Sequence, residues 1–212
     1  MKKYLAESDI INFSNFEIVA LCKKLTKNCH SDVDIVKVCF EYVRDEVRHV
    51  ADYKDKVDNE LTTYIASDVL KYKMGWCFSK SHLLAALLRY NKIPTGFCYQ
   101  RMNCSALHKK TYCLHGFNAV YLKEFGWYRI DPRGNKTFTC KGDEGLDTII
   151  IDAQFTPPVE MLAYPDAQDA PNIDKILSEP LDLVIDSLKI NNTFEVMRKK
   201  FPDVGLCSKI IE

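Results

Sequence analysis

One stretch of the sequence, residues 74–88, constrains the fold more than any other. It reads Met-Gly-Trp-Cys-Phe-Ser-Lys-Ser-His-Leu-Leu-Ala-Ala-Leu-Leu. Glycine permits tight turns that strain other residues, so Gly75 favours a turn just before Cys77. The residues that follow are apolar almost all round, as is typical of a helix buried on every side. The sequence therefore predicts a central helix that begins at Cys77 and ends near Tyr90, because Pro94 cannot continue it.

Cys77 would lie in the first turn of this helix. Backbone N–H groups there have no partner within the helix, and the helix dipole has its positive end there. Both effects favour the thiolate, which is the nucleophilic form of cysteine. The alternative is that Cys77 is simply buried, because free cysteine is among the most buried residue types. This stretch alone leaves both interpretations open.

The composition is that of an ordinary globular protein. The chain has 212 residues, of which 47% are hydrophobic, which is enough for a sizeable core in one domain. Lys+Arg and Asp+Glu both number 29, so no net field attracts nucleic acid or an anionic membrane, and neither is an expected partner. No apolar run is long enough to span a bilayer. The N-terminal residues lack the apolar run of a secretory signal, so we expect a cytoplasmic location.

Nine cysteines occur, an odd number, and no two of them form a Cys-x-x-Cys pair. We therefore expect reduced thiols rather than a disulfide framework, and no metal or other cofactor. A minor alternative is a zinc site, although the spacing of its possible ligands fits none of the usual patterns. Those ligands would come from Cys98, Cys104, His108, Cys113 and His115.

Helices are predicted before the central one. Ser14 and Glu17 form a capping box at the start of a helix within residues 13–27. A second helix should begin at Ser31 and carry an apolar face as far as residue 47, where His49 would serve its last carbonyl groups. Ser67 should cap a short third helix that runs through Tyr72 and is stopped at Gly75.

Strands are predicted from residue 95 onward. They cover residues 95–101, 112–122, 127–131 and 148–155, and the second and third form a hairpin. An irregular arm and helices near residues 181–188 and 194–200 should follow. The predicted fold is α+β, with N-terminal helices and a nucleophile-bearing central helix packed on an antiparallel sheet. We expect one domain, residues 1–212, with its core at 31–155 and the segment 156–212 packed on that core.

Three residues could together carry amide chemistry. Cys77 needs a base, a group that orients the base, and donors for the developing oxyanion. His115 can be the base and Asp131 the orienting group, while the backbone N–H of Cys77 is an expected oxyanion donor. His115 and Asp131 must share a face of the sheet, which requires an odd-length loop or a bulge between their strands. A three-residue loop, with Gly126 in the left-handed position or just past it, would meet this requirement.

These residues occur within a recognisable set of blocks. The blocks are Gly75-Trp76-Cys77, the helix ending Tyr90-Asn91-Lys92-Ile93-Pro94, His115, and Trp127-Tyr128-Arg129-Ile130-Asp131-Pro132. Together they resemble the core of the bacterial transglutaminase-like superfamily over residues 65–136, about a third of the chain. The resemblance implies a papain-like fold with Cys77 as nucleophile, His115 as base and Asp131 as the orienting residue.

Two positions depart from the family pattern. Asn91 stands where glycine is usual, and Phe117 stands where the second residue after the histidine is often tryptophan. Neither belongs to the triad. Residues 96–101 and 131–136 look like marks of one prokaryotic branch of the superfamily.

The expected function is that of a thiol-dependent hydrolase or acyltransferase. It would act on a peptide or carboxamide bond through an acyl-thioester on Cys77, with hydrolysis preferred over protein cross-linking because nothing identifies a docking surface for a protein substrate. The alternative is a catalytically silent binding module that retains the fold. The candidate substrate-binding residues are Trp76, Gln100, Arg101, Asn118, Arg133, Asn135 and Gln154. Trp76, Gln100 and Asn118 are also candidates for the second oxyanion donor, whereas His82 should satisfy a local bond.

Overall fold

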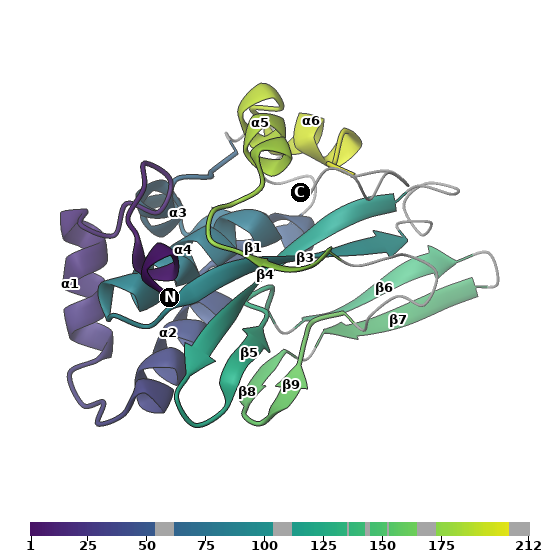
Figure 1. Ribbon diagram of the computed structural model, residues 1–212. Helices are drawn as coiled ribbons and strands as arrows, with labels where there is room; N and C mark the ends of the chain where they lie inside the picture. Colours follow the sequence, from purple (N-terminus) through teal and green to yellow (C-terminus); the bar gives the residue numbers. More distant parts are fainter. Residues whose placement is uncertain are drawn as a thin grey trace.

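The computed structural model describes residues 1–53, 62–103, 112–134, 136–142, 145–151, 153–164 and 173–203. Its centre is a four-stranded sheet in the order β10-β3-β4-β5, in which neighbouring strands are antiparallel. These strands are β3 (Thr95–Asn103), β4 (Tyr112–Leu122), β5 (Gly126–Ile130) and β10 (Ile173–Leu177). Helices and this antiparallel sheet confirm the predicted α+β class (Figure 1).

The central helix α4 runs from Cys77 to Tyr90, as predicted, and its residues from Cys77 to Arg89 are all buried. It packs against β3 and β4 on one side and against three helices on the other. Those helices are α1 (Phe16–Leu25), α2 (Asp32–Glu46) and α3 (Ala66–Tyr72). Figure 1 shows α4 behind the sheet with these helices grouped around it. The all-round apolar sequence of α4 follows from this position between two layers.

The hairpin of β4 and β5 has the predicted geometry. Leu122 is paired with Gly126 and Asn118 with Ile130, so the loop consists of residues 123–125. Gly126 has φ +76, which lies in the left-handed region that glycine adopts without strain. The odd loop length puts His115 on the same side of the hairpin as the position of Asp131.

The helix caps differ from those predicted. The N-cap of α1 is Asn15 rather than Ser14, because the Asn15 side chain accepts the N–H of Glu17 at 2.9 Å. Ser67 does not cap α3: its own backbone N–H donates to the side chain of Asn12 at 3.1 Å. The short helix α3 ends at Tyr72, as predicted, and Lys73, with φ of 49, provides a left-handed cap. A side chain therefore caps the start of α1, whereas the start of α3 has no side-chain cap and its end is capped by the backbone of Lys73.

Several short elements complete the N-terminal and middle parts of the chain. They are η1 (Lys2–Leu5), β1 (Arg48–His49), η2 (Val50–Tyr53), β2 (Met74–Gly75), β6 (Lys136–Gly142), β7 (Gly145–Ile151), β8 (Gln154–Thr156) and β9 (Val159–Met161). The prediction of one continuous strand over residues 148–155 is wrong. The chain instead ends β7 at Ile151 and starts β8 at Gln154, and the two strands pair with different partners.

The C-terminal part joins the core. Helices α5 (Asp182–Ile190) and α6 (Phe194–Lys199) lie where the sequence predicts them. The strand β10 was not predicted, and it adds to the free edge of β3. Four side chains of α5 and α6 belong to the main hydrophobic core: Val184, Leu188, Phe194 and Met197.

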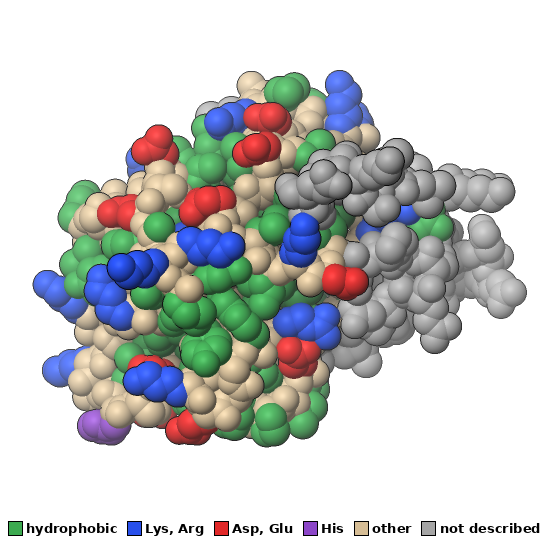
Figure 2. Space-filling model, in the orientation of Figure 1, with side chains coloured by type: hydrophobic (Ala, Val, Ile, Leu, Met, Phe, Trp, Pro, Cys, Tyr) green, Lys and Arg blue, Asp and Glu red, His purple; other side chains and the backbone are tan. Residues whose placement is uncertain are grey.

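None of the helices in the described part of the chain is long and apolar enough to cross a membrane. On the face shown in Figure 2, apolar side chains gather near the middle, and acidic and basic side chains are scattered around them without a large patch of one sign.

Candidate active site

Cys77 is the first residue of α4, and a tightly packed turn leads into it. The preceding residue, Trp76, is extended and makes no side-chain cap. Gly75 pairs with His49 in the parallel strands β1 and β2. A Cβ on Gly75 would lie 2.5 Å from the Cβ of Ser79, so only glycine lets this turn approach the first turn of the helix. Cys77 is consequently held at the helix start with 4% exposure.

His115 and Asp131 form a short, buried hydrogen bond. The Nε2 atom of His115 lies 2.7 Å from Oδ2 of Asp131, and Asp131 is fully buried. Two backbone N–H groups also donate to this carboxylate, that of Arg133 at 3.0 Å and that of Ala163 at 3.1 Å. Burial by itself would raise the pKa of Asp131, but the charge of His115 and these hydrogen bonds outweigh it and lower the pKa.

Cys77 lies within hydrogen-bonding reach of the His115 side chain. Burial lowers the pKa of His115, but the charges of Asp131 and Cys77 and hydrogen bonds to both raise it to about 10. Because Nε2 is held by Asp131, Nδ1 is the ring nitrogen that can exchange a proton with the thiol. The arrangement therefore favours a protonated His115 imidazole beside Cys77.

Aromatic rings hold the His115 imidazole on two sides. Phe117 stacks on it with ring centroids 5.8 Å apart, and Tyr164 meets it edge-on at 4.9 Å. The hydroxyl of Tyr164 accepts from Nε of Arg133 at 3.2 Å. Arg133 also makes two hydrogen bonds to the carboxylate of Asp52, at 3.0 and 2.8 Å. The sequence analysis missed Asp52 and Tyr164, since neither lies in a motif.

Arg133 is therefore placed differently from a residue that contacts substrate. It is 1% exposed, and its guanidinium is engaged by Asp52 and Tyr164. Its backbone N–H donates to Asp131. Through these contacts Arg133 stabilises the positions of Asp131 and Tyr164.

The structure brings three of the other candidate residues near the site. Trp76 adjoins Cys77, and its buried indole Nε1 has no hydrogen-bond partner among the described residues. Gln100 is buried and stands directly opposite His115 across β3 and β4. Arg101 follows it and forms an ion pair with Asp203.

Two other candidates, Asn118 and Gln154, contact other elements instead. Asn118 faces α4, where its Nδ2 donates to the carbonyl of Ser81 at 3.1 Å. Gln154 accepts from Arg44, on α2, at 3.0 Å. Asn135 lies outside the described residues.

Two further buried basic residues lie close to the triad. His49 does not serve the end of α2 as expected: its Nδ1 accepts the N–H of Ala51 at 3.3 Å. Burial, followed by the charges of Arg133 and Lys80, holds the pKa of His49 well below its usual value. Lys80 serves that helix end, since its ammonium donates to the carbonyls of Arg44 and Val47. Lys80 is 1% exposed, and burial together with the charge of Arg133 lowers its pKa to about 7.

His82 makes the local bond expected of it, with Nδ1 2.7 Å from the carbonyl of Tyr64. The cysteine expectation needs one correction, because Cys113 is disulfide-bonded. Among the described residues, five cysteines are free thiols: Cys22, Cys29, Cys39, Cys77 and Cys98. Of the possible zinc ligands, Cys104 and His108 lie outside the described residues, and no group of three metal-binding side chains gathers in the described part.

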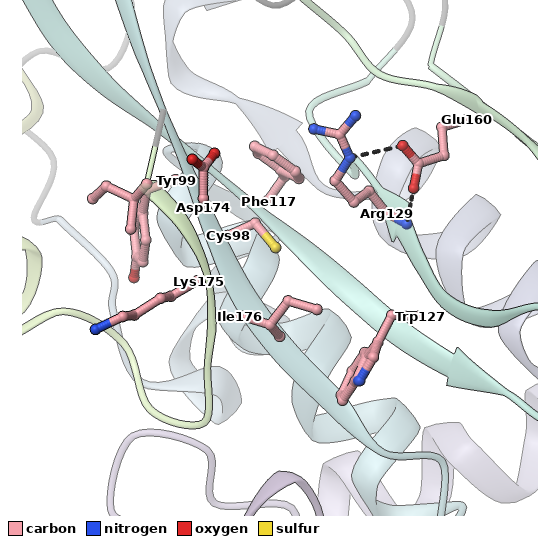
Figure 3. Close-up of a pocket in the computed structure, with 10 residues that line it drawn as sticks. Cys98, Tyr99, Phe117, Trp127, Arg129, Glu160, Asp174, Lys175 and Ile176 are labelled. Carbon is pink, nitrogen blue, oxygen red and sulfur yellow. Dashed lines mark hydrogen bonds and ion pairs between the residues drawn. The ribbon is translucent and has the colours of Figure 1, made fainter. Parts of the chain in front are cut away.

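A pocket of about 300 Å³ lies beside Phe117 on the sheet face away from α4 (Figure 3). Its apolar wall includes Cys98, Phe117, Trp127 and Ile176. Arg129 and Glu160 form one side, with Nε and Oε2 2.7 Å apart. Because Phe117 also stacks on His115, the pocket shares a wall with the triad.

A sequence model described as the transglutaminase-like superfamily matches residues 19–132. This match covers more than half of the chain and includes Cys77, His115 and Asp131. The chain belongs to the transglutaminase-like superfamily. Within this superfamily member, the family match spans α1 to the end of β5 and the following Asp131 and Pro132.

Solved structures show more distant likenesses. A proposed cysteine protease from Cytophaga hutchinsonii is 17% identical with a TM-score of 0.46, and the match covers 69% of this chain and 45% of that one. A proposed protease from Parabacteroides distasonis is 13% identical with a TM-score of 0.40, covering 74% of this chain and 30% of the other. This chain thus spans less than half the length of either. Similarity at this level does not indicate the activity of this chain. A comparison with curated proteins finds no match.

Proposed function

We propose that this member of the superfamily is a thiol-dependent hydrolase or acyltransferase that acts on a peptide or carboxamide bond. The observation that carries the proposal is the buried arrangement of Cys77, His115 and Asp131. Asp131 lies 2.7 Å from His115, and its charge together with that of Cys77 raises the pKa of His115 to about 10. A protonated imidazole beside a thiolate is the resting state that a cysteine nucleophile needs.

The residues would act in a defined order. Sγ of Cys77 attacks the carbonyl carbon, and the carbonyl oxygen becomes an oxyanion near the backbone N–H of Cys77. The tetrahedral species collapses as His115 gives its proton to the leaving amine, which leaves an acyl-thioester on Cys77. The neutral His115 then takes a proton from water, whose oxygen attacks the thioester and releases the carboxylic acid and the thiolate. If an amine takes the place of water, the product is a new amide.

Two features support roles for other residues. The indole N–H of Trp76, which has no partner in the described part of the chain, is our candidate for the second oxyanion donor. The pocket beside Phe117 offers room for an apolar side chain of the substrate.

Hydrolysis is the preferred reaction, over transfer of the acyl group to an amine. The cytoplasmic location remains an expectation from sequence, and the disulfide at Cys113 would be unusual in that compartment.

The proposal is tested by the reactivity of Cys77 toward iodoacetamide, measured by peptide mass spectrometry. Cys77 should be labelled faster than the other free cysteines, and His115→Ala should slow it by about a hundredfold or more. Cys98→Ala is the matched control, because burial raises the pKa of that thiol to about 12 and its loss should leave labelling of Cys77 unchanged. Equal labelling of all free cysteines, insensitive to His115→Ala, would favour a binding module that only retains the fold.

A further inference from the structure

One edge of β4 is left open by the end of β5. The last pair between these strands is Asn118 with Ile130, so β5 does not reach the part of β4 that holds His115. The C-terminal segment of residues 201–203 lies along this uncovered edge. The backbone N–H of Leu114 donates to the carbonyl of Pro202 at 2.8 Å. A stretch of main chain is thus bound immediately beside the proposed base.

Aromatic contacts hold the start of this segment. The ring of Phe201 lies 4.9 Å from that of Trp76 and 5.4 Å from that of Phe78. Trp76 and Phe78 are the two residues that flank Cys77 in the sequence. Phe201 therefore fills an aromatic site next to the proposed nucleophile.

A charged contact holds the end of the segment. Both carboxylate oxygens of Asp203 bond to Arg101, at 2.7 Å to Nε and 2.8 Å to Nη2. Arg101 is 4% exposed, and its guanidinium lies 4.0 Å from the ring centroid of Tyr112. The Arg101 guanidinium is thus a preformed receptor for a carboxylate, two residues along the segment from the aromatic anchor.

These three contacts are those by which a sheet edge recognises an extended peptide: a main-chain hydrogen bond and pockets for alternate side chains. Building on the proposed function, we propose that Trp76, Phe78, Leu114 and Arg101 form the peptide-binding strip of the active site. The segment 201–203 occupies this strip as an internal competitor. The strip accepts an extended peptide with an aromatic side chain, followed two residues later by a carboxylate.

Three observations indicate that the competitor is both effective and removable. The segment already occupies the contacts of the strip, because Phe201 lies against Trp76 and Phe78, Pro202 accepts from Leu114 and Asp203 pairs with Arg101, so a second peptide cannot bind there at the same time. The segment lies beyond α6, whose Phe194 and Met197 remain in the core. The side chain of Asp203 is 27% exposed, so water partly screens its ion pair with Arg101. The segment can therefore leave without unpacking α6.

The test uses the full chain and the variant Asp203→Asn. This substitution weakens the ion pair between Asp203 and Arg101 and leaves the residues of the strip unchanged. The rate constant for iodoacetamide labelling of Cys77 should rise by about fivefold, since a partly screened ion pair contributes about 1 kcal/mol. Glu195→Gln is the matched control: it removes an exposed carboxylate of α6 that pairs with Lys199, and should leave the rate unchanged. A peptide Lys-Lys-Phe-Pro-Asp-Val, added to Asp203→Asn, should slow labelling again in a saturable manner. The same peptide with asparagine for aspartate should act more weakly.

Several outcomes would overturn the inference. Equal labelling of Cys77 in wild type and Asp203→Asn, or a peptide without effect, would show that the segment does not compete for the strip. Faster labelling of the buried Cys22 and Cys39 in the variant would attribute the gain to general unfolding instead. Failure of the proposed function would give a different result: Cys77 would then be labelled no faster than Cys98 in any variant, including Asp203→Asn.

Discussion

Asp131 shows how this site keeps a buried charge. The carboxylate has no exposure to water, yet the imidazole of His115 and the N–H groups of Arg133 and Ala163 all donate to it. A buried carboxylate with this many donors stays ionised and holds its neighbour in one orientation. Its negative charge in turn keeps a proton on His115.

Asp131→Asn should remove both effects. The pKa of His115 would fall, because the charge of Asp131 raises it to about 10 in the wild type. The imidazolium present in the wild type would no longer be favoured, so labelling of Cys77 at pH 7 should drop by about thirtyfold, because only ~3% of an ordinary thiol of pKa ~8.5 is thiolate at that pH. Wild-type labelling should persist well below pH ~8.5, whereas labelling of the variant should fall away below that value, as for an ordinary thiol.

The measurement is the pH profile of iodoacetamide labelling. Asp45→Asn is a suitable control, since it removes an exposed carboxylate that pairs with Arg44. Superimposable profiles for wild type and Asp131→Asn would contradict the assigned role of Asp131.

Lys80 presents the opposite problem, a buried cation. Its pKa is lowered from 10.5 to about 7, first by burial and then by Arg133. Between these two pH values the unfolded chain binds more protons than the folded one, so this group makes stability rise with pH. At and below about pH 7 the full cost of the buried charge is present.

We therefore expect the free energy of unfolding of the wild type, minus that of Lys80→Met, to increase between about pH 7 and about pH 10. The increase should be on the order of 3 kcal/mol, because one pKa unit corresponds to about 1.4 kcal/mol. Urea unfolding at a series of pH values measures the difference. A difference that stays constant over this range would mean that Lys80 keeps its usual pKa in the folded state.

At the scale of elements, the contact between α4 and β4 positions Cys77, the proposed nucleophile, against His115, the proposed base. Gly116 lies where the strand passes the helix start, and a Cβ there would be 2.5 Å from Cδ1 of Phe78. Gly126, at the loop of the same hairpin, has no atom within 4 Å of such a Cβ but has φ +76. The two glycines are thus required for different reasons, close packing in one case and backbone conformation in the other.

Gly116→Ala should push the first turn of α4 away from β4. We expect a loss of about 2 kcal/mol in stability from overpacking, accompanied by slower labelling of Cys77 because Phe78 adjoins it. Gly126→Ala should cost about 1 kcal/mol through backbone strain alone and leave labelling unchanged. Thermal unfolding and labelling rates distinguish the two variants. Unchanged labelling in a destabilised Gly116→Ala would show that the helix start tolerates the shift.

At the scale of the whole molecule, the C-terminal part completes structures that begin earlier in the chain. Strand β10 covers the edge of β3, and the N–H of Leu181 donates to the hydroxyl of Tyr99 at 3.0 Å. Arg89, from α4, bonds the carbonyl of Ser178. These contacts support our proposal of a single domain over residues 1–212.

A chain truncated after Phe155 should therefore not fold normally. It would expose the edge of β3 and leave a hole in the core where α5 and α6 pack, and exposed edges promote aggregation. We expect an insoluble product or one with molten-globule properties, detected by loss of near-UV circular dichroism and by dye binding. Cooperative unfolding of the truncated chain with unchanged reactivity of Cys77 would show the segment to be dispensable.

The sequence by itself determined the features that depend on local pattern. A glycine turn followed by all-round apolar residues indicated that α4 starts near Cys77. A run of β-favouring residues predicted β4 with the bounds that it has in the structure. The parity argument for His115 and Asp131 required only the period of a strand and the length of a loop. Such features follow from chain geometry over a few residues, so they can be deduced before the fold is known.

Only the tertiary structure decided which distant side chains meet. Arg133 pairs with Asp52, 81 positions away, and Arg101 with Asp203, 102 positions away. The ammonium of Lys80 donates to a carbonyl at the end of α2. Strand β10 is too short and too weakly alternating to be recognised without β3 beside it. A charged side chain carries no local signal of its partner. The partner is set by which elements the core packs together, because a buried charge is stable only where the fold supplies compensating groups.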